Sequence, residues 1–286
     1  MQIIEHIKSL RTALDAPRRE GKGVGLVPTM GALHEGHLAL IDRAREHATT
    51  VVVSLFVNPL QFGPNEDFAR YPRDRDADAR LAEARGVDIL FAPQLDELYP
   101  GARAIAVVPG ALASRWDGAS RPGHFTGVLT VVAKLFNIVQ PDVAIFGQKD
   151  VQQATLIRAM IRDLDIPVRM IVAPTVRESD GVALSSRNRY LSAADRERAR
   201  VLSRAIFAMR DAFDAGERAT AVLESLGNSI VAAGSGAALE YLAVMDPDTL
   251  EPIPVASAGS IIAIAARVGA TRLIDNVILG APGQGG

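Results

Sequence analysis

The sequence contains no cysteine. This absence excludes a disulfide, a thiol nucleophile and a thiolate metal site. No uninterrupted apolar run approaches the roughly 20 residues that a helix needs to cross a bilayer. The first ten residues carry charges and no long apolar segment, so we expect no signal peptide. We therefore expect a soluble, cytoplasmic protein with no membrane partner.

An excess of one charge is also missing. Lysine and arginine number 31 against 33 aspartate and glutamate, which gives a net charge of −2. No basic run stands out, and nucleic-acid binding is therefore not indicated. The chain has no repeat and no low-complexity segment. Its 48% hydrophobic and 22% charged content is typical of a globular protein, and 286 residues suffice for one large domain or two unequal ones.

Segments typical of strands and of helices alternate through residues 1–175. The β-branched run at 50–57 is typical of an interior parallel strand. The alternation predicts an α/β fold with a doubly wound, Rossmann-like parallel sheet, which binds ligands beyond the carboxyl ends of its strands. We expect strands at 24–27, 50–57, 87–92, 143–146 and 168–172, helices at 4–14, from 35, 74–85, 128–139 and 152–164, and a connection at 17–25.

The composition shifts after Pro174, which predicts a second, smaller α+β domain over residues 176–286. We expect this domain to close over the ligand site of the first. Its expected helices span 192–213 and 220–233, its strands span 239–245 and 260–268, and residues 283–286 are expected to form a frayed tail.

The most informative stretch is residues 24–40, read VGLVPTMGALHEGHLAL. His34 and His37 are three residues apart at the start of a helix that follows a strand. A helix start offers unpaired N–H groups and a partial positive charge, which suit a phosphate. Gly31 and Gly36 would let a ligand approach the backbone closely. The spacing alone leaves open a tight turn with two surface histidines.

Residues 34–37 resemble the HxGH signature of the nucleotidylyltransferase superfamily, which grips the phosphates of ATP. The longer string PTMGALHEGH, residues 28–37, resembles the pantothenate synthetase (pantoate–β-alanine ligase) family. This resemblance implies a catalytic role for His34 and His37. It implies ATP binding by Met30, Gly31, Ala32, Leu33, His34, Glu35, Gly36 and His37.

Two glutamines lie close to predicted strand ends. Gln61 follows a buried strand, and its amide can read a hydroxyl and a carboxylate at once, although a loop glutamine is usually exposed. The resemblance implies that Gln61 contacts both pantoate and β-alanine, and that Gln153 contacts pantoate.

A second cluster, residues 147–150, follows another strand. Gly147 permits close approach of the backbone, Lys149 offers a mobile positive charge, and Asp150 could simply cap a helix. The resemblance implies ATP binding by Gly147, Gln148, Lys149 and Asp150, with Lys149 catalytic. Relatives often carry glutamate where this chain has Gln148, so we assign no charged role there.

Two further clusters complete the candidate site. Two serines beside an arginine form a plausible phosphate cradle, or else a polar linker between domains. The resemblance assigns Val176, Leu184, Ser185, Ser186 and Arg187 to ATP, with Arg187 catalytic. Arg121 and His124 precede an apolar helix, which they could merely cap, and the resemblance assigns both to substrate binding.

The resemblance implies a two-step reaction of ATP, pantoate and β-alanine through pantoyl adenylate, with no protein nucleophile, and it implies a homodimer. Mg²⁺ is expected on phosphate oxygens and water. The acidic run expected after Tyr71 is broken at residues 74–78, and we assign no protein ligand to the metal. An adenylyl- or cytidylyltransferase and a non-catalytic nucleotide-binding module are the alternatives. The presence of both Gln61 and Gln153 argues against both.

Overall fold

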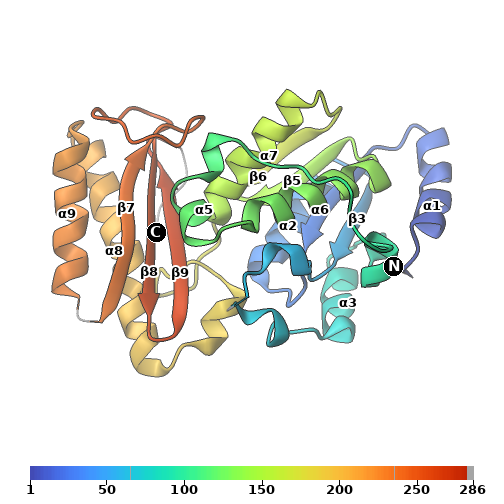
Figure 1. Ribbon diagram of the computed structural model, residues 1–286, viewed down its shortest axis with the longest axis horizontal. Helices are drawn as coiled ribbons and strands as arrows, with labels where there is room; N and C mark the ends of the chain where they lie inside the picture. Colours follow the sequence, from blue (N-terminus) through green and yellow to red (C-terminus); the bar gives the residue numbers. More distant parts are fainter. Residues whose placement is uncertain (65, 235, 282–286) are drawn as a thin grey trace. The chain divides into compact units, whose positions relative to one another are not determined.

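The chain forms two compact units, shown in Figure 1. The computed structural model describes residues 1–64, 66–234 and 236–281. Met1–Gly147 and Leu156–Ala173 make up the larger unit, and Gln148–Thr155 and Pro174–Gly286 make up the smaller one. The division into two domains with a boundary near Val176 stays a prediction. No helix in the described part of the chain is long and apolar enough to cross a membrane.

The larger unit is built on a parallel sheet. Its strands are β1 (Gln2–Ile4), β2 (Val24–Thr29), β3 (Thr50–Leu55), β4 (Ile89–Phe91), β5 (Val143–Gly147) and β6 (Arg169–Ala173), in the order β1-β4-β3-β2-β5-β6. All neighbouring pairs run parallel. The chain proceeds from β2 toward β3 and β4 on one side and reaches β5 and β6 on the other. The strand order thus reverses between β2 and β5, and open α/β sheets bind ligands beyond the carboxyl ends at such a point. The predicted fold class is confirmed.

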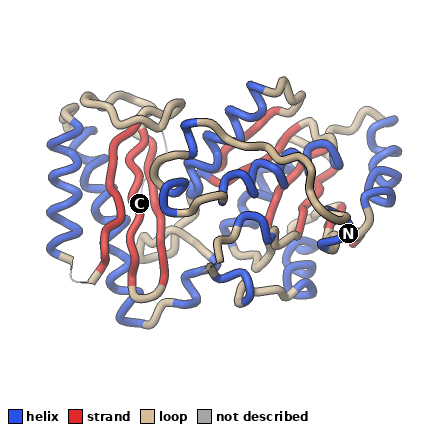
Figure 2. Tube along the Cα trace, viewed as in Figure 1, coloured by secondary structure: helices blue, strands red, loops and turns tan. Residues whose placement is uncertain are grey.

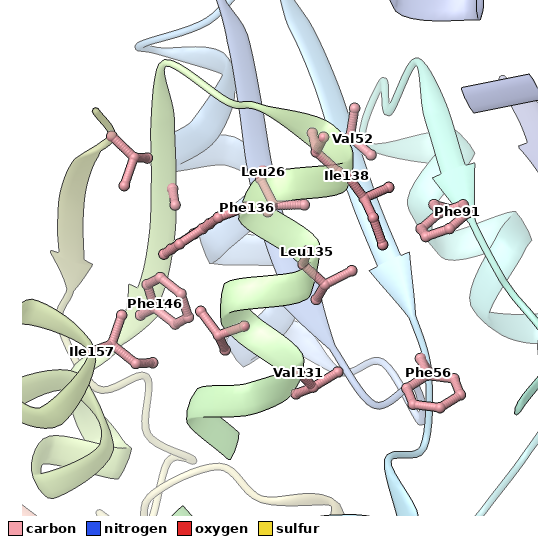
Figure 3. Close-up of a cluster of buried hydrophobic side chains, with 14 of the residues drawn as sticks. Leu26, Val52, Phe56, Phe91, Val131, Leu135, Phe136, Ile138, Phe146 and Ile157 are labelled. Atoms are coloured by element: carbon pink, nitrogen blue, oxygen red, sulfur yellow. The ribbon is translucent and has the colours of Figure 1, made fainter. Parts of the chain in front are cut away.

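Helices cover both faces of this sheet. One face packs against α1 (Ile7–Arg19), α6 (His124–Val139) and the later part of α7 (Val151–Asp163), and the other against α2 (Glu35–Arg45) and α3 (Arg75–Ala84). Successive strand residues point to opposite faces, so Leu26 joins the first core and Val27 the second. Figure 3 shows Leu135 and Phe136 of α6 among the sheet side chains. Burial on both faces explains why the strands read as continuous apolar runs.

The connections of the larger unit hold short helical turns. These are η1 (Pro59–Gln61), η2 (Asp67–Ala69), α4 (Leu95–Leu98), η3 (Ala111–Ala113) and α5 (Asp117–Ser120).

The smaller unit contains an antiparallel sheet in the order β7-β8-β9, formed by β7 (Ala237–Met245), β8 (Ile261–Val268) and β9 (Thr271–Ile278). Figure 2 shows these long strands side by side. The helices α8 (Ala193–Asp214) and α9 (Thr220–Ala233) pack on the sheet and share its buried core. Two short turns, η4 (Gln148–Asp150) and η5 (Ser186–Tyr190), also belong to this unit.

Some predicted boundaries are wrong, for local reasons. Ile4 belongs to β1, and α1 continues through Pro17 to Arg19 where the sequence predicts a connection. Pro17 lies in the last turn, which closes with the N–H of Glu20 on the carbonyl of Ala16. α6 begins at His124, directly after Gly123 in the left-handed region at φ +82°. β9 was not predicted, because polar residues interrupt its apolar pattern. The predicted frayed tail lies outside the described residues.

Candidate active site

His34 and His37 form a reciprocal cap at the start of α2. His34 Nδ1 accepts a hydrogen bond from the N–H of Gly36 at 3.1 Å, and His37 Nδ1 accepts one from the N–H of His34 at 3.3 Å. The ring centroids lie 4.1 Å apart. Because each Nδ1 is an acceptor, each neutral ring carries its proton on Nε2. Each imidazole is thus in the tautomer whose Nε2–H can donate to a phosphate oxygen.

This cap changes which groups at the start of α2 can donate to a phosphate. The sequence predicts open backbone N–H groups at the helix start, but the two imidazoles take those of His34 and Gly36. For these two amides the prediction is wrong. At this helix start, the imidazole Nε2–H groups can donate in place of those two amides. The imidazoles lie where β2 leads into α2, next to the point where the strand order reverses.

The loop before this cap is fastened by Asp78. The carboxylate of Asp78, on α3 and 3% exposed, accepts the N–H of Ala32 at 2.9 Å and the N–H of Leu33 at 2.7 Å. Gly31 and Ala32 both have left-handed backbone, with φ of +84° and +53°. Two consecutive amides in such a conformation form a concavity that binds an anion, and here the anion is a side chain of the protein. A Cβ on Gly31 would lie 2.8 Å from Asp78 Oδ2, so this position requires glycine.

Gln61 ends η1, just beyond β3, and is 8% exposed. Its Nε2 lies 2.7 Å from Met30 Sδ, and its Oε1 accepts a hydrogen bond from Asn58 Nδ2 at 3.3 Å. A thioether is a weak acceptor, so an oxygen atom of a substrate would be a better partner for this N–H group. Asn58 is 1% exposed and also bonds to the carbonyl of Gly127 and to the hydroxyl of Tyr99. The structure thus fixes the orientation of the Gln61 amide through Asn58.

Arg121 and His124 fasten the backbone of Gln61. Arg121 pairs with both carboxylate oxygens of Glu66 at 2.7 Å, and its Nη1 lies 2.8 Å from His124 Nε2. His124 Nδ1 lies 2.7 Å from the carbonyl oxygen of Gln61. Because guanidinium can only donate and a carbonyl can only accept, His124 is neutral and carries its proton on Nδ1.

The charges of this network agree with that tautomer. Burial, with the nearby charge of Arg121, lowers the pKa of His124 to about 4. Burial alone would raise the pKa of Glu66, but the hydrogen bonds and charge of Arg121 outweigh it and hold that pKa below its usual range. Both ring nitrogens of His124 are therefore occupied within the larger unit.

The segment after β5 belongs to the smaller unit. Gln148 is buried, and its Nε2 donates to Asn276 Oδ1 at 3.1 Å. Lys149 is half-buried, and its ammonium forms no ion pair with any residue that the structure describes. Asp150 is exposed, and Gln153 is half-buried in the first turn of α7. A lysine with this exposure can meet a phosphate without first breaking an ion pair.

The predicted second nucleotide segment is an ordered turn of the smaller unit. The N–H of Leu184 donates to the carbonyl of Val176 at 2.9 Å, and the N–H of Glu178 donates to that of Val182. Ser185 then caps η5 by accepting the N–H of Arg187 at 3.3 Å. Residues 176–187 therefore form a hydrogen-bonded loop directly after the boundary between the two units. Its roles in ATP binding and as a linker between domains both stay predictions.

Sequence reasoning missed Asn58 and the holding role of Asp78. Both are buried polar residues whose partners lie elsewhere in the chain. The sequence signal for Asn58 is its place directly after the strand predicted at 50–57, three residues before Gln61. Within the described residues, no three histidine, aspartate or glutamate side chains gather as a metal site.

Comparisons with known proteins identify the family. Residues 2–278 match the family model described as pantoate-beta-alanine ligase. The chain is 51% identical to a pantothenate synthetase of Moorella thermoacetica over 98% of this chain and 99% of the relative. It is 50% identical to pantothenate synthetase 1 of Bradyrhizobium diazoefficiens, over 98% of each chain.

Solved structures agree. The crystal structure of pantothenate synthetase from Thermus thermophilus superposes with a TM-score of 0.92 at 49% identity, over 97% of this chain and 99% of that one. A pantoate-beta-alanine ligase from Francisella tularensis, solved in complex with beta-gamma ATP and beta-alanine, superposes with a TM-score of 0.79 at 35% identity, over 97% of each chain. The chain therefore belongs to the pantoate-beta-alanine ligase family, and it is a ligase.

Proposed function

We propose that this ligase joins pantoate to β-alanine through pantoyl adenylate. A carboxylate oxygen of (R)-pantoate attacks the α-phosphorus of ATP, the bond from that phosphorus to the bridging oxygen breaks, and pyrophosphate leaves. The amine of β-alanine then attacks the acyl carbon, AMP leaves, and the nitrogen loses a proton to give pantothenate. The family supports this reaction, as does the Francisella tularensis relative that holds beta-gamma ATP and beta-alanine.

The observation that carries the proposal is the reciprocal histidine cap. The N–H of Gly36 bonds to His34 Nδ1 and the N–H of His34 bonds to His37 Nδ1, so each neutral ring carries its proton on Nε2. Donors fixed before the reaction stabilise charge that develops on a departing pyrophosphate more effectively than mobile donors do. Lys149 adds a positive charge, and we assign it, with both histidines and Arg187, to the phosphates. The remaining proposed ATP contacts are Met30, Gly31, Ala32, Leu33, Glu35, Gly36, Gly147, Gln148, Asp150, Val176, Leu184, Ser185 and Ser186. Ala32 and Leu33 would contact ATP through atoms other than their N–H groups, because Asp78 accepts those.

We assign Gln61 and Gln153 to the acid and amine substrates. Asn58 holds the Gln61 amide with Nε2 directed at a weak acceptor, a position where a pantoate oxygen would bind better. Arg121 and His124 belong to this substrate side, and their existing partners support a role that acts through Gln61. No step needs a protein nucleophile, in keeping with a chain without cysteine.

Mg²⁺ enters this scheme as part of the MgATP substrate. The carboxylate of Asp78 is engaged by two amides, and the described residues offer no cluster of metal-ligating side chains. Where the protein offers no such cluster, magnesium commonly binds through substrate phosphates and retained water. The homodimer and the cytoplasmic location stay predictions.

Exchange of labelled pyrophosphate into ATP tests the proposed function. Adenylate formation is reversible and precedes the amine, so exchange should require pantoate and Mg²⁺ but proceed without β-alanine. Exchange that ignores pantoate would contradict the proposal and favour a nucleotidylyltransferase with another acceptor.

A further inference from the structure

Asn276 on β9 makes three hydrogen bonds to the segment that contains Lys149. Its Nδ2 donates to the carbonyl oxygens of Gln148 and Lys149, each at 2.9 Å, and its Oδ1 accepts Gln148 Nε2 at 3.1 Å. Asn276 is 1% exposed. A side-chain amide can donate twice and accept at the same time, which no carboxylate or hydroxyl can do. The amide thus fixes the backbone before and after the Cα atom of Lys149. Asn276 itself lies on a strand more than a hundred residues further along the chain.

Its neighbour Asp275 holds the other nucleotide segment of the smaller unit. Arg177 pairs with both oxygens of Asp275, at 2.7 and 2.9 Å, and the side chain of Asp275 is 3% exposed. Arg177 also donates to the carbonyl of Gly181 at 3.0 Å, which closes the turn between Val176 and Leu184. Burial raises the pKa of Asp275, while the hydrogen bonds and charge of Arg177 act in the opposite direction. The bidentate geometry is that of an ion pair.

Adjacent residues of one strand thus reach two different segments. Successive side chains of a strand point to opposite faces of its sheet. The Asp275 carboxylate bonds to Arg177, and the Asn276 amide bonds to the main chain at Lys149. Leu273 and Val277 of the same strand pack in the buried core. This packing holds β9 in place and thereby fixes the positions of Asp275 and Asn276.

We propose that Asp275 and Asn276 are positioning residues that fix the two ATP-contacting segments of the smaller unit to β9. This inference rests on the proposed function, since it assigns Lys149 and residues 176–187 to ATP. Neither residue touches a reacting atom. Asn276 places the main chain of Lys149, so that the ammonium meets the phosphates in one position. Asp275 places Arg177, and through it the turn that leads to Arg187.

A double-mutant cycle tests the Asn276 half of the proposal. Asn276→Ala should slow pantoate-dependent pyrophosphate exchange about tenfold or more. If Asn276 acts through Lys149, the double variant with Lys149→Ala should be no more than about twofold slower than Lys149→Ala alone. Full additivity of the two losses would overturn the proposal, because a general structural defect adds to any other loss.

Two controls keep the outcome interpretable. Asn228→Ala removes an exposed asparagine of α9 whose side chain donates to the carbonyl of Glu224 in the same helix, and exchange should stay at the wild-type rate. Pantoyl adenylate supplied from outside should react with β-alanine on Asn276→Ala at close to the wild-type rate. If Asn276→Ala does not keep wild-type thermal unfolding, Asn276→Thr replaces it, since a hydroxyl keeps one donor and an acceptor in the buried site but cannot donate to both carbonyl oxygens. The same selective loss is expected.

The second half is tested by Asp275→Asn. Arg177 then loses its charged partner but keeps a hydrogen-bond acceptor, so the KM for ATP should rise severalfold with little change in the rate of the second step. An unchanged KM would overturn the role of Asp275. Failure of the proposed function can be distinguished from failure of this inference, because the wild-type enzyme itself would then show no pantoate-dependent pyrophosphate exchange.

Discussion

His37 and His34 share one cap, but they do not occupy equivalent positions. His34 is the N-cap residue itself, whereas His37 lies in the first turn of α2. Replacing His37 removes an Nε2–H donor and leaves the N-cap in place. We predict that His37→Ala lowers the rate of adenylate formation by about 10²-fold, the scale for the loss of one preorganised donor.

The half-reactions separate this role from general damage. Externally supplied pantoyl adenylate carries no pyrophosphate, so its reaction with β-alanine should stay close to the wild-type rate in His37→Ala. Rapid-quench measurement of both steps provides the comparison, with thermal unfolding as the check on folding. Equal loss in both steps would show that His37 organises the pocket instead of the leaving group.

His124 makes a prediction about pH and stability. Its pKa is about 4 in the folded protein and near 6.5 when unfolded. Between these values the unfolded chain binds a proton that the folded chain does not, so stability falls as pH falls from about 6.5 toward 4. His124→Asn removes this linkage. Between about pH 6.5 and pH 5, the free energy of unfolding of the wild type should fall by about 1.5 kcal/mol more than that of this variant.

Urea unfolding at a series of pH values measures this difference. His6 is the matched control, because its hydrogen bond and charge interaction with Glu97 raise the pKa of this exposed histidine. His6 therefore adds to the free energy of unfolding at low pH, and this contribution is lost as pH rises. The variant His6→Asn should not flatten the dependence of that free energy on pH. An identical slope for wild type and His124→Asn would show that the histidine is not buried in its neutral form.

The residues of the motif could be predicted from the sequence, and those that hold them could not. His34, His37 and Gln61 lie within strings that resemble a known family. Asp78, Asn58 and Asn276 act through buried hydrogen bonds to segments 46, 69 and 128 residues away in the chain. Local pattern contains no information about such pairings. The same buried polar pair, Asp275 and Asn276, interrupts the apolar pattern that would otherwise have predicted β9.

At the scale of elements, the contact between α6 and η1 determines where Gln61 lies. A Cβ on Gly127 of α6 would fall 2.2 Å from the carbonyl oxygen of Leu60 and 2.6 Å from the N atom of Gln61. These are backbone atoms, so η1 or α6 has to move. We predict that Gly127→Ala lowers stability by about 1–3 kcal/mol through overpacking. It should also raise the KM for pantoate about tenfold or more, because an unpaired substrate oxygen loses about 1–3 kcal/mol.

The KM for ATP should change little in this variant, because α6 and η1 contribute none of the proposed ATP contacts. Gly110→Ala is the matched control, since a Cβ there meets no atom within 4 Å and its φ is −80°. Steady-state kinetics with each substrate varied in turn gives the comparison. Equal increases in both KM values would indicate that Gly127 supports the fold as a whole.

The elements that the sequence predicted are those whose apolar pattern follows from simple burial. β2, β3 and β5 lie inside a sheet covered on both faces, so each reads as an apolar run. The boundaries that failed depend on single backbone conformations. Pro17 is accommodated in a closing turn, and Gly123 allows α6 to begin at His124. Neither follows from periodicity.

At the scale of the whole molecule, the division into two compact units does not follow the order of the chain. Residues 30–37 and Gly147 belong to the larger unit, while 148–150 and 176–187 belong to the smaller one. The strand and helix pattern predicted the parallel sheet, since that pattern is local. It did not predict that 148–155 group with a unit formed otherwise by residues 174–286, because this grouping depends on packing between distant segments.

If pantoate is activated as an acyl adenylate, one oxygen atom of its carboxylate passes to AMP, and isotope labelling measures this transfer. Pantoate whose carboxylate carries a heavy oxygen isotope is incubated with the enzyme, ATP, Mg²⁺ and β-alanine, and the nucleotide products are analysed by mass spectrometry. Attack of the carboxylate on the α-phosphorus places one labelled oxygen in AMP and leaves pyrophosphate unlabelled. Labelled inorganic phosphate together with ADP would instead show transfer of the γ-phosphoryl group and would contradict activation as an acyl adenylate.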